Sequence, residues 1–133
     1  MRIRIDVDLE KGTILKTDLP EKALWLGGRA LAESILLQEV PPACHPLGSR
    51  NVLVFAPGLF AGTSMPTASR MSVAGKSPLT GGIKESNVGG MAGMIFSQLG
   101  VGAVVIKGMS PVGHPKLLLV GKRSSELIEV PEL

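Results

Sequence analysis

Apolar and polar residues alternate strictly at the start of the chain. Ile3, Ile5, Val7 and Leu9 fall on one face of an extended segment, and Arg2, Arg4, Asp6 and Asp8 fall on the other. This period of two predicts a half-buried strand over residues 2–9. Lys11-Gly12 can make a turn and residues 13–18 can return as a second strand, so we expect a hairpin. Solvation on the polar face is the simplest role for the two carboxylates.

Apolar residues at helical spacing predict two helices. In residues 29–39, Leu31 with Ile35 and Ala32 with Leu36 are four positions apart, and Pro41-Pro42 ends the segment. Pro20 suits the first turn of a helix. A second, short helix is expected after residues 87–90, where apolar side chains again recur at helical spacing. They are Ala92, Ile95, Phe96 and Leu99.

The remaining apolar runs are short, which is typical of strands. Residues 51–56 (NVLVFA) form the strongest run. Further strands are expected at 69–75, 82–86, 101–107, 116–120 and 126–130, separated by turns that are mostly rich in glycine. The pattern predicts one α+β domain over residues 1–133, built from twisted, mostly antiparallel β-sheets with two short helices.

Composition narrows the classes of protein. The chain has 17 glycines, 10 prolines and 3% aromatic residues, so turns and close backbone contacts are expected. A net charge of +3 without a Lys/Arg run is not a nucleic-acid signature. Neither a signal-peptide pattern nor an apolar stretch of roughly 20 residues is present, which favours a cytoplasmic protein without membrane spans.

Metal-binding and catalytic side chains are scarce. Cys44 is the single cysteine, and one thiol makes neither an internal disulfide nor an iron–sulfur cluster, so we expect a plain thiol. His45 and His114 lie beside prolines, without a ligand-spaced partner. No Ser/His/Asp arrangement is recognisable, and no catalytic residue is predicted.

Small hydroxyls, isolated bases and glycine gather in one stretch. Residues 58–102 hold ten of the seventeen glycines, and such a composition lets backbone N–H groups approach an anion. Residues 86–90 (SNVGG) precede the second predicted helix and could point amides at a phosphate. The alternative is that Ser86 or Asn87 caps that helix, and the residues alone favour capping.

Several motifs in order resemble the N-terminal domain of the aldehyde:ferredoxin oxidoreductase family. Trp25–Leu31 (WLGGRAL) resembles the family motif WLGGRGL, and residues 100–108 (GVGAVVIKG) resemble a later family strand. Between them the family's order and spacing are kept across nearly all of the chain. The matching segments are Ala56-Pro57-Gly58-Leu59, Gly62-Thr63-Ser64, Pro66-Thr67, Ser69-Arg70, residues 76–81 (KSPLTG) and residues 87–90 (NVGG).

The resemblance implies a base of twisted sheets that supports a tungsten- or molybdenum-bis-pterin cofactor. It implies that Arg70 reaches toward the pterin phosphates and a nearby iron–sulfur cluster. The backbone carbonyl of Asn87 would bind a magnesium ion that bridges the phosphates, and Gly89 would lie beside the pterin. Lys76 and Ser77 are further candidate cofactor-binding residues. The alternative for Arg70 is an ordinary surface ion pair.

The sequence also departs from the family pattern. Ala30 stands where glycine is common, and the chain stops at residues 130–133 where family members continue with a Trp-Gly segment. We therefore expect the other half of the cradle, the cysteines of a 4Fe–4S cluster and the catalytic acid/base groups on a further domain or subunit. That assembly would oxidise an aldehyde to a carboxylic acid and pass electrons to ferredoxin. Two alternatives stay open. One is a stand-alone module that binds pterin or phosphate, with two copies pairing as a homodimer in one version, and the other is an inactive remnant.

Overall fold

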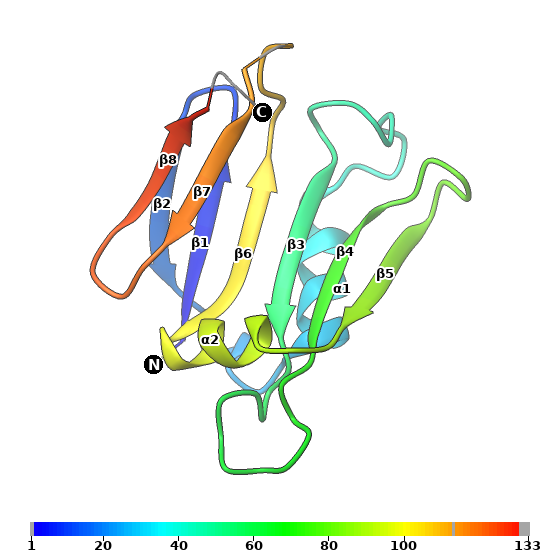
Figure 1. Ribbon diagram of the computed structural model, residues 1–133. Helices are drawn as coiled ribbons and strands as arrows, with labels where there is room; N and C mark the ends of the chain where they lie inside the picture. Colours follow the sequence, from blue (N-terminus) through cyan, green and yellow to red (C-terminus); the bar gives the residue numbers. More distant parts are fainter. Residues whose placement is uncertain (1, 113, 131–133) are drawn as a thin grey trace.

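A six-stranded mixed sheet forms the body of the protein in the computed structural model, which describes residues 2–112 and 114–130. Two helices and a separate two-stranded sheet lie against it (Figure 1). The elements in chain order are β1 (Ile3–Asp8), β2 (Thr13–Asp18), the 3₁₀ turn η1 (Glu21–Ala23), α1 (Gly28–Glu39), β3 (Val52–Pro57), β4 (Met71–Lys76), β5 (Ile83–Val88), α2 (Ala92–Gln98), β6 (Val101–Lys107), β7 (Lys116–Val120) and β8 (Ser125–Glu129).

Strand β6 lies in the middle of the large sheet, whose order is β2-β1-β6-β3-β4-β5. It pairs in parallel with β1 and antiparallel with β3, and the other neighbouring pairs are antiparallel. The predicted α+β class, the first hairpin and both helices are confirmed. The helix expected at Pro20 is a single 3₁₀ turn, and β5 extends two residues beyond the predicted segment 82–86.

Helix α1 covers one face of the sheet. Its apolar side chains at positions 31, 32, 35 and 36 are all buried, as the spacing predicts. They contact alternate residues of three central strands, among them Val54 in β3, Ala74 in β4 and Val105 in β6. The small alanines on the strands let the helix lie close to the sheet, and this cluster is the larger of two hydrophobic cores.

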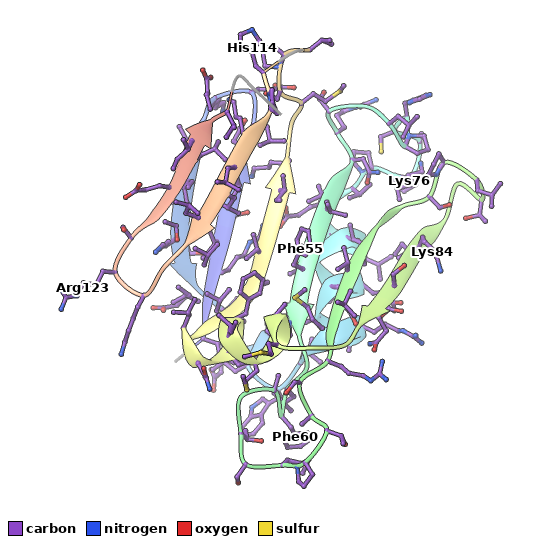
Figure 2. The ribbon with its side chains drawn as sticks, viewed as in Figure 1. Phe55, Phe60, Lys76, Lys84, His114 and Arg123 are labelled. Carbon is purple, nitrogen blue, oxygen red and sulfur yellow. The ribbon has the colours of Figure 1, made fainter. Side chains whose placement is uncertain are left out.

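The opposite face is covered only in part. Ile5, Val7, Val101 and Val104 form the second core, beneath the hairpin β7–β8 and helix α2. Figure 2 shows that Phe55 on β3 stands on this face beside the area that these elements cover. Leu53 on the same strand is 42% exposed, so the β3–β5 side of this face remains open and partly apolar.

The polar face of β1 has a structural role that the alternation alone does not show. Arg4 binds both carboxylate oxygens of Asp6, at 2.8 and 2.5 Å, and also reaches Glu39 of α1 at 2.5 Å. Asp8 accepts the backbone N–H groups of Glu10 and Lys11, which forms the turn of the hairpin. The expectation that both carboxylates are simply solvated is therefore wrong.

Within residues 2–112 and 114–130, neither helix is long and apolar enough to span a membrane.

The packing of α1 generates a test of the core. Leu36 is 2% exposed, whereas its neighbour Leu37 is 76% exposed. We expect Leu36→Ala to lower the free energy of unfolding by about 2–5 kcal/mol, because it leaves a cavity under the helix. Leu37→Ala, the same change one residue away, should cost less than about 0.5 kcal/mol. Urea unfolding of both variants measures the difference. Equal losses would contradict the assignment of this face.

Candidate functional site

Arg70 and Asn87, two residues named by the resemblance, lie side by side. Arg70 directly precedes β4, and Asn87 is opposite Ser72 near the end of β5. The Nη1 group of Arg70 donates a hydrogen bond of 2.8 Å to Oδ1 of Asn87. Both residues are exposed, and Gly89-Gly90 follows after Val88. Among residues 2–112 and 114–130 Arg70 has no salt bridge, so the ion-pair alternative is wrong there.

The capping alternative is also wrong. Ser86 and Asn87 belong to strand β5 and not to a helix terminus. Helix α2 begins later, its N-cap is Met91, and no side chain makes a capping hydrogen bond there. The helix has only seven residues, so its N-terminus offers little dipole to an anion. The polar groups at this position are therefore presented by a strand and the turn that follows it.

Two glycines hold the backbone of Arg70 in place. The N–H of Gly58 donates to the carbonyl of Arg70 at 2.9 Å, and a Cβ added at Gly58 would lie 3.2 Å from that oxygen. A Cβ at Gly93, in α2, would lie 2.8 Å from the carbonyl of Ser69 and 3.0 Å from that of Arg70. A side chain at Gly93 would force the backbone apart, whereas one at Gly58 would be tight. Gly93 was not singled out from the sequence, although a glycine inside a helical pattern often marks close packing.

The WLGGR segment reaches the same end of the sheet. A Cβ at Gly27 would lie 2.4 Å from the backbone nitrogen of Leu59, so the first and second family motifs are in contact through bare backbone. Gly28 has a φ of +53° and lies against the Ser72 side chain. The motifs at 25–31, 56–59, 69–70 and 87–90, separate in the sequence, thus gather at one end of the sheet, the lower end in Figure 1.

Behind Asn87 lies a carboxylate that the sequence reasoning missed. Glu85 accepts a hydrogen bond of 2.6 Å from the Ser72 hydroxyl, and Arg29 of α1 binds its other oxygen at 3.0 and 3.3 Å. The Glu85 side chain is only 8% exposed. The Ser72 hydroxyl, then Arg29 and the Asn87 side chain, hold the pKa of Glu85 below its ordinary value. No periodicity marks this residue, because its partners come from α1 and β4.

Lys76 and Ser77 lie elsewhere, at the opposite end of β4. Lys76 is six positions after Arg70 along the strand, which corresponds to roughly 20 Å, and Figure 2 shows Lys76 at the upper end. Its Nζ group donates to the carbonyls of Pro42 and, at 2.8 Å, of Cys44. The buried Ser77 hydroxyl accepts the N–H groups of Leu79 and Thr80. Both side chains hold the loops at this end.

Cysteine and histidine form no metal centre in the part of the chain that the structure describes, and no group of three or more His, Cys, Asp or Glu side chains could hold an ion there. Cys44 is a buried free thiol. His45 accepts the N–H of Leu47 at its Nδ1 atom, which fits a turn residue. The buried thiol of Cys44 fits the plain thiol expected from the sequence.

The fold and site together define an α+β sheet domain whose glycine-rich segments meet at one end around an exposed guanidinium. A family model described as "Aldehyde ferredoxin oxidoreductase, N-terminal domain" matches residues 4–133. The chain therefore belongs to the aldehyde ferredoxin oxidoreductase family and corresponds to the N-terminal domain of its members, as the ordered motifs predict.

Relatives and a solved structure agree with this assignment. The chain is 42% identical over 106 residues to a tungsten-containing aldehyde ferredoxin oxidoreductase of Pyrococcus furiosus, which covers 78% of the chain and 18% of the relative. It is 36% identical over 123 residues to the enzyme of that name from Pyrococcus horikoshii, which covers 91% and 20%. The chain thus spans about one fifth of the length of these relatives.

The fold also matches the active site complex BamBC of benzoyl coenzyme A reductase, solved with 1,5-dienoyl-CoA. The TM-score is 0.90 at 29% sequence identity, and the match covers 97% of this chain and 20% of that chain. A sheet domain of this shape is therefore also part of a larger enzyme with a different name.

The lowered pKa of Glu85 predicts a pH dependence of stability. A carboxyl group whose pKa is depressed by folding stabilises the protein above its unfolded value of about 4.3, and this stabilisation is lost as the pH falls through the lower folded value. We expect Glu85→Gln to be less stable than wild type at pH 7 by about 1–3 kcal/mol, because the buried Ser72 hydroxyl and the exposed Arg29 both lose a charged acceptor. The gap should narrow below about pH 4.3.

Urea unfolding between pH 7 and pH 3 measures this gap. Glu126→Gln is the matched control, because Glu126 is exposed on β8 and has no salt bridge within the described part of the chain. A gap for Glu85→Gln that stays constant down to pH 3 would show that the charge of Glu85 does not contribute.

Proposed function

We propose that this chain supplies the phosphate-binding part of a tungsten- or molybdenum-bis-pterin cradle in an oxidoreductase of the aldehyde:ferredoxin type. The observation that carries the proposal is the exposed Arg70 guanidinium, which is hydrogen-bonded at 2.8 Å to Asn87, two residues before Gly89-Gly90. The names of the relatives support tungsten as the metal of the family.

The residues at this end fit a phosphate-bearing cofactor. A guanidinium without a carboxylate partner keeps N–H donors for phosphate oxygens, which it can bind in pairs. A Cβ added at Gly89 or Gly90 would meet no heavy atom within 4 Å, so both positions border open space. Gly90 has a φ of +91°, which side chains rarely adopt. A flat ligand can therefore approach the backbone at this turn.

The three site residues, Arg70, Asn87 and Gly89, each bind or orient a group in this proposal. Arg70 binds and neutralises a pterin phosphate, and Asn87 orients Arg70 while its backbone carbonyl supplies a hard oxygen ligand for Mg²⁺. Gly89 leaves room for the edge of the pterin. When bound, the metal-pterin group supplies the two-electron redox chemistry. No side chain of this chain is assigned a proton-transfer step.

Lys76 and Ser77 remain a second, weaker part of the proposal. Their polar groups already hydrogen-bond within the loops at residues 42–44 and 77–80, at the other end of β4 from Arg70. A role in cofactor binding would need a ligand that spans the sheet or a rearrangement of those loops. The Arg70 end is therefore the primary binding site that we propose.

The complete assembly needs a further domain or subunit. The chain covers 18–20% of the tungsten-containing relatives, and the single cysteine of the chain supplies too few ligands for an iron–sulfur cluster. We propose that a catalytic partner carries the 4Fe–4S cluster and completes the cradle. The assembly would oxidise an aldehyde to its acid and pass electrons to ferredoxin in the cytoplasm, where the thiol of Cys44 stays reduced.

The proposal predicts where an anion binds. Inorganic pyrophosphate with Mg²⁺, titrated into ¹⁵N-labelled chain, should shift the amide signals of Arg70, Gly89 and Gly90. Arg70→Gln should weaken binding about tenfold or more, because charge-assisted hydrogen bonds to phosphate are lost. The matched control is Arg123→Gln, since Arg123 is an exposed arginine at the turn of β7–β8 (Figure 2). Its affinity should stay within about twofold of wild type.

Two outcomes would contradict the proposal. Equal losses for both arginine variants would show only nonspecific charge attraction. Shifts confined to residues 76–80 would move the site to the Lys76 end of the sheet.

A further inference from the structure

We infer that Gly93 of helix α2 is a positioning residue for Arg70. Its bare backbone lets the main chain of Arg70 lie directly against the helix, and anion binding by the guanidinium depends on that position. This role rests on the proposed function for its ligand, and on backbone contacts for its geometry. Gly93 is buried, so it acts on the ligand through its neighbours and not by direct contact.

Helix α2 and the segment before β4 meet backbone to backbone. A Cβ added at Gly93 would lie 2.8 Å from the carbonyl oxygen of Ser69 and 3.0 Å from that of Arg70. It would also lie 3.1 Å from the carbonyl carbon of Arg70. All three neighbours are main-chain atoms, which cannot rotate away as the end of a flexible side chain can. Any residue larger than glycine therefore displaces the main chain of Ser69 and Arg70, or the helix itself.

The main chain of Arg70 is also held by the sheet. The N–H of Gly58 donates to the Arg70 carbonyl at 2.9 Å. Arg70 leads directly into β4, where the next residue, Met71, is paired with β3 on one side and with β5 on the other. The side chain therefore starts from a fixed Cα position, from which its Nη1 group reaches Oδ1 of Asn87 at 2.8 Å.

Helix α2 is itself anchored, so it cannot simply move away from an added side chain. Phe96 and the C-cap residue Leu99 pack against the second core. A Cβ added at Gly62 would lie 2.8 Å from the Cβ of Ser97, so the loop after β3 also lies directly against the helix. An added methyl group on α2 therefore displaces the end of the loop, Arg70 included, more readily than the helix.

Helix propensity alone does not favour glycine at this position. Alanine is the best helix former and glycine is among the poorest, because glycine loses the most backbone freedom. Alanine at position 93 would therefore help a helix of only seven residues. The contact with Ser69 and Arg70 excludes it. Helix formation and the position of Arg70 thus make opposite demands on this residue.

The experiment measures the affinity of the whole chain for pyrophosphate with Mg²⁺ by calorimetry, at constant pH and ionic strength. We expect Gly93→Ala to weaken binding about fivefold or more, because a displaced guanidinium loses charge-assisted hydrogen bonds to phosphate. Gly58→Ala, whose Cβ would lie 3.2 Å from the same carbonyl, should weaken binding about threefold. Thermal unfolding shows which variants are folded, and Gly58→Ala decides if Gly93→Ala is not. Unchanged affinity in the deciding variant would overturn the inference.

Gly75→Ala is the matched control. Gly75 lies in β4, and a Cβ there would lie 3.1 Å from the carbonyl oxygen of Val52, so the change again crowds a backbone carbonyl. Its affinity for pyrophosphate should stay within about twofold of wild type, since Gly75 is five positions, or roughly 16 Å, after Arg70. A fivefold loss in Gly75→Ala would indicate a general effect on the fold and overturn the inference.

A double-mutant cycle tests whether Gly93 acts through Arg70. Arg70→Gln removes the guanidinium, so adding Gly93→Ala to it should lower the affinity by less than about a further twofold. Losses that multiply in full would show that α2 affects the site by another route, and they would overturn the positioning role.

A second readout needs no ligand. The NMR signals of the Arg70 Nε–H group and of the Asn87 side-chain NH₂ group report on the hydrogen bond between the two side chains. We expect both signals to shift in Gly93→Ala and to keep their wild-type positions in Gly75→Ala. If wild type binds no pyrophosphate, the proposed function fails, and this measurement alone decides the positioning. Signals that stay unchanged in Gly93→Ala, or that shift equally in both variants, would overturn it.

Discussion

Strand β6 is the constraint on which the structure depends. It is hydrogen-bonded to β1 on one side and to β3 on the other, and it joins the N-terminal hairpin to the β3–β4–β5 unit. Both of its faces are buried, with Val105 toward α1 and Val104 toward the second core. A strand with two buried faces reads as a continuous apolar run, as VGAVVIK does. Without this strand the two halves of the sheet would have separate, small cores.

The elements could be predicted from the sequence because each has a local signal. The alternation in residues 2–9 and the i,i+4 pairs of α1 depend only on neighbours in the chain, and both were correct. The pairing of β1 with β6 could not be predicted in this way, since almost a hundred residues separate the two strands and neither sequence indicates its pairing partner. The same holds for the Arg4–Glu39 pair across the sheet and helix.

The candidate site also combines residues that the sequence indicates with contacts that only the fold creates. The resemblance indicated Arg70, Asn87 and Gly89, and the structure brings the first two into contact. Capping by Ser86 or Asn87 was wrong because β5 continues through both residues to pair with β4. Local composition does not distinguish a capping Asn from a strand Asn, since either can precede a glycine turn. The need for little or no side chain at Gly58 and Gly93 becomes visible only in the fold, where both glycines lie close to the carbonyl of Arg70.

A carboxylate near a proposed anion site disfavours anion binding unless another positive group compensates its charge. Glu85 meets that condition: Arg29 neutralises it, Ser72 satisfies its second oxygen, and its side chain is largely shielded from solvent. Within residues 2–112 and 114–130 Arg70 has no salt bridge and donates to the neutral amide of Asn87, so its positive charge is not compensated by a carboxylate there. Two arginines and one carboxylate leave a net charge of about +1, placed at the outer end. An Arg70 paired directly with a carboxylate would be equally well ordered but would hold no charge for a phosphate.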